Sequence, residues 1–242
     1  METIKIKSAY NINLLRNNPY PGRGIVTGMS PDSKRLVQIY WIMGRSENSR
    51  NRIFIEENGF IKTEAWDACK VEDPSLIIYY AAKHQKATHI ISNGDQTDTV
   101  YNAIECSDTF EDALNTRNFE PDIPNYTPRI SGVIDLNDKQ YTYKLYIIKS
   151  IYNNPSFCVR QFYYYEKAIP GFGHCIHTYL GDGDPLPSFD KEPFVVPIFD
   201  DIYETANFYW DILNENNKIS ILAKYIDIST NEFKTAIINK SK

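Results

Sequence analysis

Runs of apolar, β-branched and aromatic residues, separated by turn signals, dominate the first third of the chain. Residues 25–29 and 36–43 form two such runs, and the Ser-Pro-Asp-Ser segment between them is typical of a turn. Residues 52–56 and 60–66 form a second pair around an Asn-Gly dipeptide, which readily adopts the positive φ angles of a tight turn. The pattern therefore predicts two β-hairpins.

The rest of the chain continues this strand-rich pattern. Tyr141, Tyr143, Leu145 and Ile147 stand at every second position, the spacing of side chains on one face of a strand. Further strands are predicted over residues 76–82, 88–92, 130–136, 141–149, 157–165, 219–228 and 233–238.

Helical periodicity is present in three places. Apolar residues repeat at spacings of three and four after Thr97 and again after Thr109, which predicts two short neighbouring helices. A third helix is predicted from residue 202, with Asp200 or Asp201 as its N-cap and Glu204 placed for a capping box. The first fifteen residues alternate polar and apolar side chains, and no helix is predicted for them.

Strands outnumber helices, and hairpins outnumber strand-helix-strand crossovers. The pattern therefore predicts an α+β fold, with mostly antiparallel sheets and helices packed on the outside. The 242 residues contain no linker rich in glycine, serine or proline and no abrupt change in composition, so we expect a single domain over residues 1–242.

Composition and charge exclude several classes of protein. The net charge of -5 and the lack of a basic face argue against binding to a polymeric nucleic acid, which needs many phosphate contacts. The apolar runs are shorter than the roughly 20 residues of a membrane span, and no signal peptide is expected, so the expected location is the cytoplasm. The four cysteines form no CxxC pair, which argues against a zinc site or a disulfide framework.

Cationic side chains are nevertheless concentrated in one short segment. Arg45, Arg50 and Arg52 alternate with serine and asparagine and are opposed only by Glu47. Guanidinium groups beside short hydrogen-bonding side chains suit a phosphate and its neighbouring hydroxyls. The alternative interpretation is a solvated turn.

Four separated motifs carry a resemblance to a known family. They are Arg23-Gly24-Ile25, then Arg45-Ser46 with Asn51-Arg52, then Ser92-Asn93-Gly94 with Thr97-Asp98, and finally Asn125 to Ile130. With these motifs in this order, the chain resembles the archaeal-type IMP cyclohydrolase family. The resemblance implies the four-layer αββα sandwich of the N-terminal-nucleophile-like fold. Because Met1-Glu2 offers no nucleophile, the fold would be kept without that mechanism.

The implied reaction is dehydrative closure of the last purine ring, from a formamidoimidazole carboxamide ribonucleotide to IMP. Since nucleophile and electrophile belong to one molecule, catalysis needs positioning, proton transfer and stabilisation of the departing oxygen. Neither a metal nor an organic cofactor is expected, and the expected partner is a purine-pathway mononucleotide. Whether the chain forms a homo-oligomer is left open.

The resemblance also implies roles for individual residues. Glu120 matches an acidic residue near the base and is the leading general acid/base candidate. Tyr79 would bond the reacting formyl oxygen, with core packing as the alternative, and Arg45 or Arg23 would face the developing oxyanion. The remaining implied substrate contacts are Arg23, Gly24, Tyr40, Ser46, Asn51, Arg52, Asn93, Gly94, Gln96, Thr97, Asn125, Thr127 and Arg129.

Two loops receive more specific interpretations. Asp95 and Asp98 place negative charge at the start of the first central helix, so residues 93–97 are expected to contact the base or ribose hydroxyls and not the phosphate. The glycine-rich segment 170–187 is expected to close over the pocket, with His174 or His177 near the ligand. On a strand, Cys175 and His177 share one face and His174 points to the other. The two histidines are therefore not expected to bind one metal ion together.

One departure from the family pattern keeps other functions open. The tyrosine matched by Tyr79 is often followed by asparagine in the family, whereas here Tyr80 follows it. If that asparagine touches the substrate, the pocket differs in shape. The alternatives are therefore a non-catalytic or altered-substrate purine-nucleotide-binding protein of the same fold, and another amide hydrolase on this fold, which the lack of a terminal nucleophile weakens.

Overall fold

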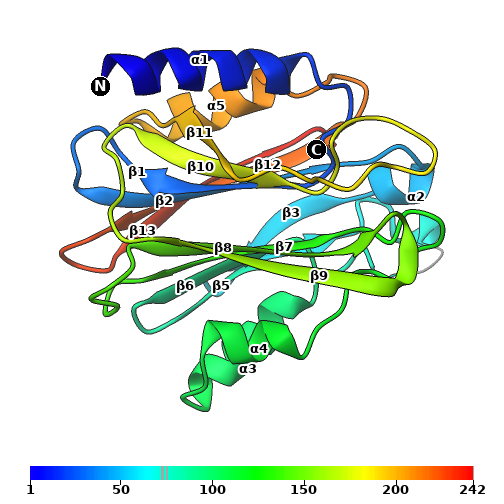
Figure 1. Ribbon diagram of the computed structural model, residues 1–242, viewed down its shortest axis with the longest axis horizontal. Helices are drawn as coiled ribbons and strands as arrows, with labels where there is room; N and C mark the ends of the chain where they lie inside the picture. Colours follow the sequence, from blue (N-terminus) through cyan, green and yellow to red (C-terminus); the bar gives the residue numbers. More distant parts are fainter. Residues whose placement is uncertain (72–73, 75, 242) are drawn as a thin grey trace.

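Two antiparallel sheets stack face to face, and helices cover both outer faces (Figure 1). The computed structural model describes residues 1–71, 74 and 76–241. The resulting layers follow the order helix, sheet, sheet, helix, and every strand pair within the described sheets is antiparallel. The predicted α+β class and its layered sandwich are confirmed.

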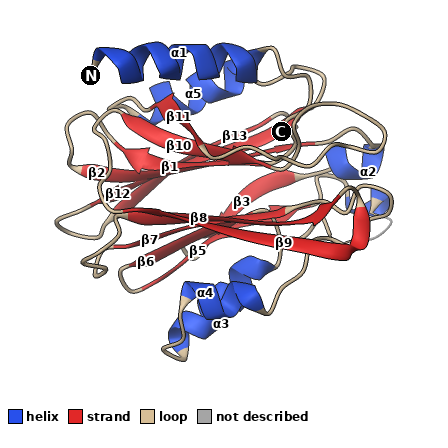
Figure 2. Ribbon diagram, viewed as in Figure 1, coloured by secondary structure: helices blue, strands red, loops and turns tan. Residues whose placement is uncertain are grey.

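The first sheet has six strands in the order β11-β10-β1-β2-β12-β13. Helices α1 (Glu2–Arg16) and α5 (Ile202–Ile212) lie on its outer face (Figure 2). The strands are β1 (Gly24–Met29), β2 (Arg35–Met43), β10 (Phe172–His177), β11 (Phe194–Pro197), β12 (Lys218–Asp227) and β13 (Phe233–Asn239).

The second sheet has seven strands that follow one another in chain order from β3 to β9. Helices α3 (Gln96–Glu105) and α4 (Phe110–Asn115) cover its outer face, and the short helix α2 (Glu47–Arg50) links the two sheets. The strands are β3 (Ile53–Glu57), β4 (Phe60–Glu64), β5 (Tyr80–Gln85), β6 (Thr88–Ser92), β7 (Arg129–Asp135), β8 (Tyr143–Ile151) and β9 (Asn154–Tyr165).

Local turn and cap chemistry produces the expected local structure. Asn58 and Gly59 have φ angles of 53° and 77° and join β3 to β4, as the hairpin prediction requires. Asp201 caps α5 by accepting a hydrogen bond from the Glu204 amide at 2.8 Å. The predicted hairpin of β1 and β2 is also confirmed.

Three predicted segments differ from the structure. The strand predicted over 76–82 begins only at Tyr80, because the Ile77 and Ile78 amides bond the Pro74 carbonyl in a turn. The segment 170–187 contains strand β10 and is not a continuous loop. Its Gly173 lies opposite Gly28 of β1, where an added Cβ would come within 2.9 Å of a neighbouring carbonyl oxygen.

Helix α1 is the third difference. Its buried face contains the polar Ser8 and Asn11 beside Ile12 and Leu15, so the apolar spacing of a helix is hidden in the sequence. Asn11 donates from Nδ2 to the Val195 carbonyl of β11 at 2.8 Å, which ties the helix to the sheet edge. Tertiary contact therefore decides the conformation of this segment.

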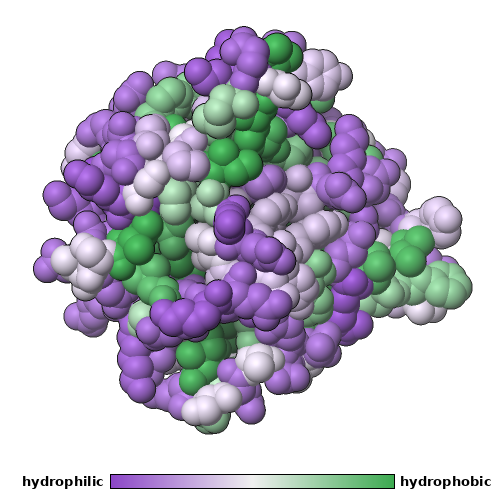
Figure 3. Space-filling view, turned by 60° about the vertical axis from the view of Figure 1, so that its left-hand side comes forward, coloured by the Kyte–Doolittle hydropathy of each residue, from purple (hydrophilic) through white to green (hydrophobic). Residues whose placement is uncertain are grey.

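The space between the sheets forms the apolar core of the sandwich. Ile25 and Tyr40 from the first sheet pack against Phe54, Ile91 and Leu145 from the second, and all five are almost fully buried. On the outside, hydrophobic atoms form separate patches between hydrophilic ones (Figure 3). Among the described helices, none has the length and apolarity that a membrane crossing requires.

Lys224 of β12 is a cation within this core. It is 1% exposed, its Nζ lies 4.1 Å from the centre of the Phe233 ring, and it forms no ion pair with any described residue. Burial lowers its pKa from 10.5 to about 7. The folded state therefore binds the proton less well than the unfolded state, and stability falls as pH decreases from about 10 to 7.

We expect Lys224→Met to stabilise the protein at pH 7 by roughly 1–4 kcal/mol, because an uncompensated charge leaves the core. Chemical unfolding at pH 7 and pH 9 measures the effect, which should be smaller at pH 9. The exposed Lys234 of β13 offers the matched control, and Lys234→Met should leave both values unchanged. A destabilised Lys224→Met protein would show that the ammonium group contributes a favourable contact.

Candidate active site

A cavity of ≈ 260 Å³ opens at one end of the sheet sandwich, where four segments meet. The volume is slightly below the roughly 300 Å³ at which small-molecule sites begin, so the cavity suits a compact ligand. The residues come from the segment before β1, the end of β2 with α2, and the loops that follow α4 and β10. They are Tyr20, Gly22, Arg23, Met43, Arg45, Ser46, Ser49, Arg52, Asp122, Asn125, Thr127, Tyr179 and Leu186.

Arg52 is a buried arginine that forms no ion pair with any acidic residue the structure describes. Its side chain is 1% exposed, its Nε donates to the Ser49 carbonyl at 2.7 Å, and its Nη1 has no hydrogen-bond partner among the described residues. Burial lowers its pKa, and the neighbouring Arg23 adds to this effect. Since a buried charge is normally paired, this guanidinium is suited to an anion that enters the cavity.

The segment from the end of β2 through α2 also contributes Arg45 and two serines to the cavity lining. The Arg45 guanidinium lies 5.3 Å from the centre of the Tyr20 ring and donates from Nη1 to Asp182 at 2.7 Å. Ser46 caps α2 by accepting from the Ser49 amide at 3.1 Å, which leaves its own hydroxyl hydrogen available. Arg45 is 38% exposed, so it lies at the mouth of the cavity.

Glu120 does not itself line the cavity, but it pairs with Arg23, which does. The Arg23 Nη1 is 3.0 Å and 3.1 Å from the two carboxylate oxygens, and Glu120 is 2% exposed. Its backbone amide donates to the Thr127 carbonyl, which fixes the loop. Burial raises the pKa of the Glu120 carboxyl above its usual value, although Arg23 and Arg129 act against this. A carboxyl group in this environment is suited to exchanging a proton.

Two tyrosine hydroxyls meet beside this pair. Tyr40 of β2 and Tyr79, directly before β5, are 6% exposed or less, and their hydroxyl oxygens are 2.7 Å apart. Burial raises the Tyr40 pKa well above its usual value, so the Tyr40 hydroxyl stays protonated at neutral pH. Because one hydroxyl donates to the other, one proton of the pair remains available for a ligand.

Tyr80, the departure from the family pattern, points away from the cavity. Its ring lies 4.2 Å from the Lys83 Nζ, and its hydroxyl is 3.5 Å from a Glu57 carboxylate oxygen. Neighbouring strand residues face opposite sides of a sheet, so Tyr79 faces the core while Tyr80 faces α3. The tyrosine at position 80 therefore does not alter the shape of the cavity.

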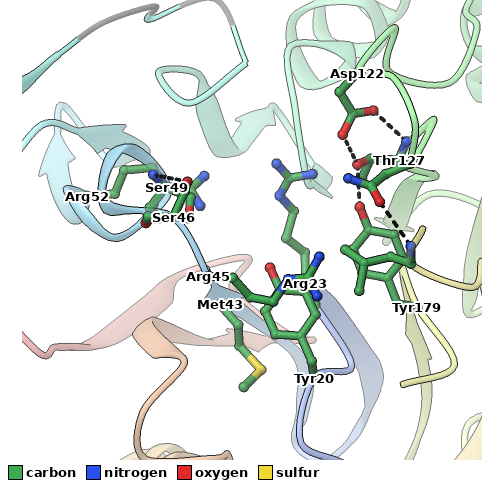
Figure 4. A pocket seen from close by; sticks show the side chains of 13 residues that line it. Tyr20, Arg23, Met43, Arg45, Ser46, Ser49, Arg52, Asp122, Thr127 and Tyr179 are labelled. Carbon is green, nitrogen blue, oxygen red and sulfur yellow. Dashed lines mark hydrogen bonds between the residues drawn. The ribbon is translucent and has the colours of Figure 1, made fainter. Parts of the chain in front are cut away.

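The side opposite Arg52 is acidic. Asp122 accepts from the Thr127 amide at 2.6 Å and from the Thr127 hydroxyl, which also contacts the Tyr179 hydroxyl. Figure 4 shows Arg23 between this group and the group of Arg52, Ser46 and Ser49. Burial raises the Tyr179 pKa, so its hydroxyl remains protonated.

The loop over residues 93–97 does not line the cavity. Asn93 donates to the Pro128 carbonyl at 2.9 Å and accepts from the Ile130 amide at 2.8 Å, while Gln96 accepts from Arg129 at 2.7 Å. The side chains of Asn93 and Gln96, which were expected to contact the base or the ribose, instead form hydrogen bonds to residues at the start of β7 and directly before it. Gly94 and Thr97 belong to the same turn, in which the Thr97 hydroxyl donates to the Gly94 carbonyl.

Three other expected contacts also have structural roles. An added Cβ at Gly24 would lie 2.0 Å from the Trp41 ring, so the glycine allows that ring to pack. Asn51 bonds the backbone of Asp67 at 2.7 Å and 2.8 Å. His174 lies outside the cavity, with Nδ1 2.7 Å from the Tyr143 hydroxyl and its ring stacked 4.1 Å from Tyr165, because β10 directs it between the sheets. We therefore do not retain it as a ligand contact.

Several lining residues were not expected from the sequence. Asp122 lies between Glu120 and the motif that begins at Asn125, and Ser49 lies within the arginine-rich segment, so proximity along the chain could have indicated both. Tyr179 and Leu186 belong to the segment 170–187 that was expected near the pocket, but neither residue was singled out. Tyr20, Gly22 and Met43 have no local signal. Backbone bonds between Arg23 and Thr178 and between Tyr179 and Pro21 bring the two segments together. Over residues 1–71, 74 and 76–241, no group of three or more histidines, cysteines or acidic residues could hold a metal ion.

Comparison with known proteins adds a separate observation. The model of a family described as IMP cyclohydrolase-like protein matches residues 20–232, a range that includes every residue lining the cavity. A search of curated proteins finds no match.

Proposed function

The chain belongs to the IMP cyclohydrolase-like family, and from this membership and the chemistry of the cavity we propose that it closes 5-formamidoimidazole-4-carboxamide ribonucleotide to IMP with loss of water. The observation that carries the proposal is that Arg52 and Arg23 line one small cavity and that Arg23 holds the buried Glu120. Arg52, which no described acidic residue pairs, offers an anion site, and the Glu120–Arg23 pair offers a proton-transferring group beside a fixed cation. A mononucleotide needs both.

In this proposal the substrate phosphate lies against the cationic side. Arg52 and Arg45 neutralise its charge, and the Ser46 hydroxyl donates a further hydrogen bond. The exposed position of Arg45 favours phosphate binding at the mouth over the oxyanion contact considered from the sequence. Arg23, deeper in the cavity, takes the oxyanion role.

The ring closure needs one bond to form and one oxygen to leave. The carboxamide nitrogen attacks the formyl carbon, and the ionised Glu120 accepts a proton from that nitrogen. Arg23 and the Tyr40–Tyr79 hydroxyl pair stabilise the charge that develops on the formyl oxygen. Glu120 then returns the proton to this oxygen, which becomes a hydroxyl group. The hydroxyl leaves as water with a second proton, the one that the former formamide nitrogen loses as the ring C=N double bond forms.

A turnover assay tests the proposal. The purified protein is incubated with the formylated ribonucleotide, and the absorbance of the purine ring is followed. We expect IMP to form in proportion to enzyme concentration. Normal mononucleotide affinity without turnover would contradict the reaction and support the alternative of a binding protein, and an absence of both would contradict the assignment of the cavity.

A further inference from the structure

The cavity presents two chemically different sides to one ligand. Arg52 and the Ser46 hydroxyl supply hydrogen-bond donors on one side, while Asp122 supplies a carboxylate on the other (Figure 4). The Arg45 guanidinium lies over the Tyr20 ring. Asp122 forms no ion pair with any described residue, unlike Glu120, which is neutralised by Arg23. A phosphate is therefore repelled from the Asp122 side, and this polarity fixes the direction in which a nucleotide enters.

The protons around Asp122 are already used. The Thr127 hydroxyl donates its single hydrogen to Asp122, so the contact between Thr127 and Tyr179 requires the Tyr179 hydroxyl to donate to Thr127. The Thr127 amide also donates to Asp122, at 2.6 Å. Neither the Thr127 nor the Tyr179 hydroxyl has a hydrogen left to donate to a ligand. The groups around Asp122 can therefore only accept hydrogen bonds from a ligand.

The carboxylate has acceptor sites to spare. Two oxygens accept about four hydrogen bonds in total, and Asp122 accepts two from protein groups. The backbone holds it firmly, since the amides of Asn125 and Tyr126 donate to the Asp122 carbonyl at 2.9 Å and 3.0 Å. A ligand that fits here must offer hydrogen-bond donors next to its phosphate-bearing part.

We propose that Asp122 binds the ribose hydroxyls and makes the site specific for ribonucleotides over 2′-deoxyribonucleotides. The 2′- and 3′-hydroxyls are the donors that a nucleotide carries between its phosphate and its base. This inference rests on the proposed function, because it takes a mononucleotide as the ligand. The sequence had predicted that Asn93 and Gln96 contact the ribose hydroxyls, but both side chains form hydrogen bonds within the protein. The proposal assigns these ribose contacts to Asp122 instead.

Calorimetric titration with three ligands tests the inference. IMP, 2′-deoxy-IMP and inosine are compared on the wild-type protein and on Asp122→Asn, which keeps the size of the side chain. Since a hydrogen bond to a charged group contributes about tenfold or more, wild type should bind IMP at least about tenfold more tightly than 2′-deoxy-IMP. Asp122→Asn should reduce this ratio to about threefold or less while leaving the ratio of IMP to inosine unchanged.

Asp182→Asn is the matched control, because it also removes a carboxylate charge near the cavity but one that contacts Arg45 at the mouth. It should leave the preference for ribose intact. Equal affinity of wild type for IMP and 2′-deoxy-IMP would overturn the inference alone, as would an equal loss of both affinities in Asp122→Asn, which would indicate that Asp122 only supports Thr127. A folded wild-type protein that binds no IMP would overturn the proposed function as well.

Discussion

Replacing Glu120 with glutamine is expected to lower kcat by a factor of about 10²–10⁴, the usual contribution of a positioned acid or base. Glutamine keeps the shape of the side chain, and its oxygen still accepts from Arg23, but it exchanges no proton. The affinity for IMP should change far less than kcat, because the phosphate contacts are elsewhere in the cavity. Steady-state turnover and calorimetric IMP binding separate the two effects.

The pH dependence of activity distinguishes proton transfer from a structural role. Burial raises the pKa of Glu120, so the ionised form that accepts a proton is lost as pH falls through a value above 4.5. In wild type, kcat/KM should therefore decrease on the acidic side with this raised pKa. The decrease should be absent from Glu120→Gln. Glu111→Gln on α4, which removes a partner of Lys144, should keep both the rate and the profile.

Two results would contradict the assignment of Glu120. Full activity in Glu120→Gln would remove it from the reaction. An unchanged acidic limb with a uniformly lower rate would show that the carboxylate only holds Arg23, and thermal unfolding would then reveal whether the loss arises from a weakened buried pair.

Replacing Arg52 with glutamine should weaken IMP binding by roughly 10–100-fold, the effect of losing charge-assisted hydrogen bonds to a phosphate. The affinity for inosine, which has no phosphate, should remain nearly constant. Stability should stay within about 1 kcal/mol of wild type or increase, because the substitution removes a buried charge that no described acidic residue pairs, which offsets the loss of one charge-assisted hydrogen bond to the Ser49 carbonyl. Ligand titration and chemical unfolding test the two statements separately.

Arg129 provides a matched comparison for Arg52. It is also buried, but it pairs with Asp95 at 2.6 Å and with Gln96 at 2.7 Å. Arg129→Gln should therefore destabilise the fold by about 1–3 kcal/mol, because buried charge-assisted hydrogen bonds are lost while the half-exposed Asp95 keeps its contact with Arg117. If Arg52→Gln destabilised the protein to the same degree and left IMP affinity unchanged, Arg52 would be a structural residue and the phosphate assignment would be wrong.

Local chemistry explains what could be predicted from the sequence. The turn at Asn58-Gly59, the cap at Asp201 and the short helices after Thr97 and Thr109 depend on residues close in the chain, and they form as expected. The segment around Arg52 was also singled out from composition alone. These features require no knowledge of which distant segments meet.

Long-range contacts explain what could not be predicted. Asp122 and Tyr179 both contact Thr127 because the loops after α4 and β10 converge. No pattern in the local sequence predicts that these two loops lie side by side. The same limit applies to Asn93, whose side chain matches a binding motif but is engaged by the backbone of residues 128 and 130. The position of His174 also could not be predicted, because its side chain points between the sheets only if the glycine-rich segment forms strand β10.

The structure of the protein with bound IMP tests the central claim most directly. The phosphate should lie within hydrogen-bond distance of Arg52, with the ribose hydroxyls at Asp122 and the purine ring beside Glu120 and the Tyr79 hydroxyl. IMP bound in a different cavity, or in this one with its phosphate distant from Arg52, would contradict the account.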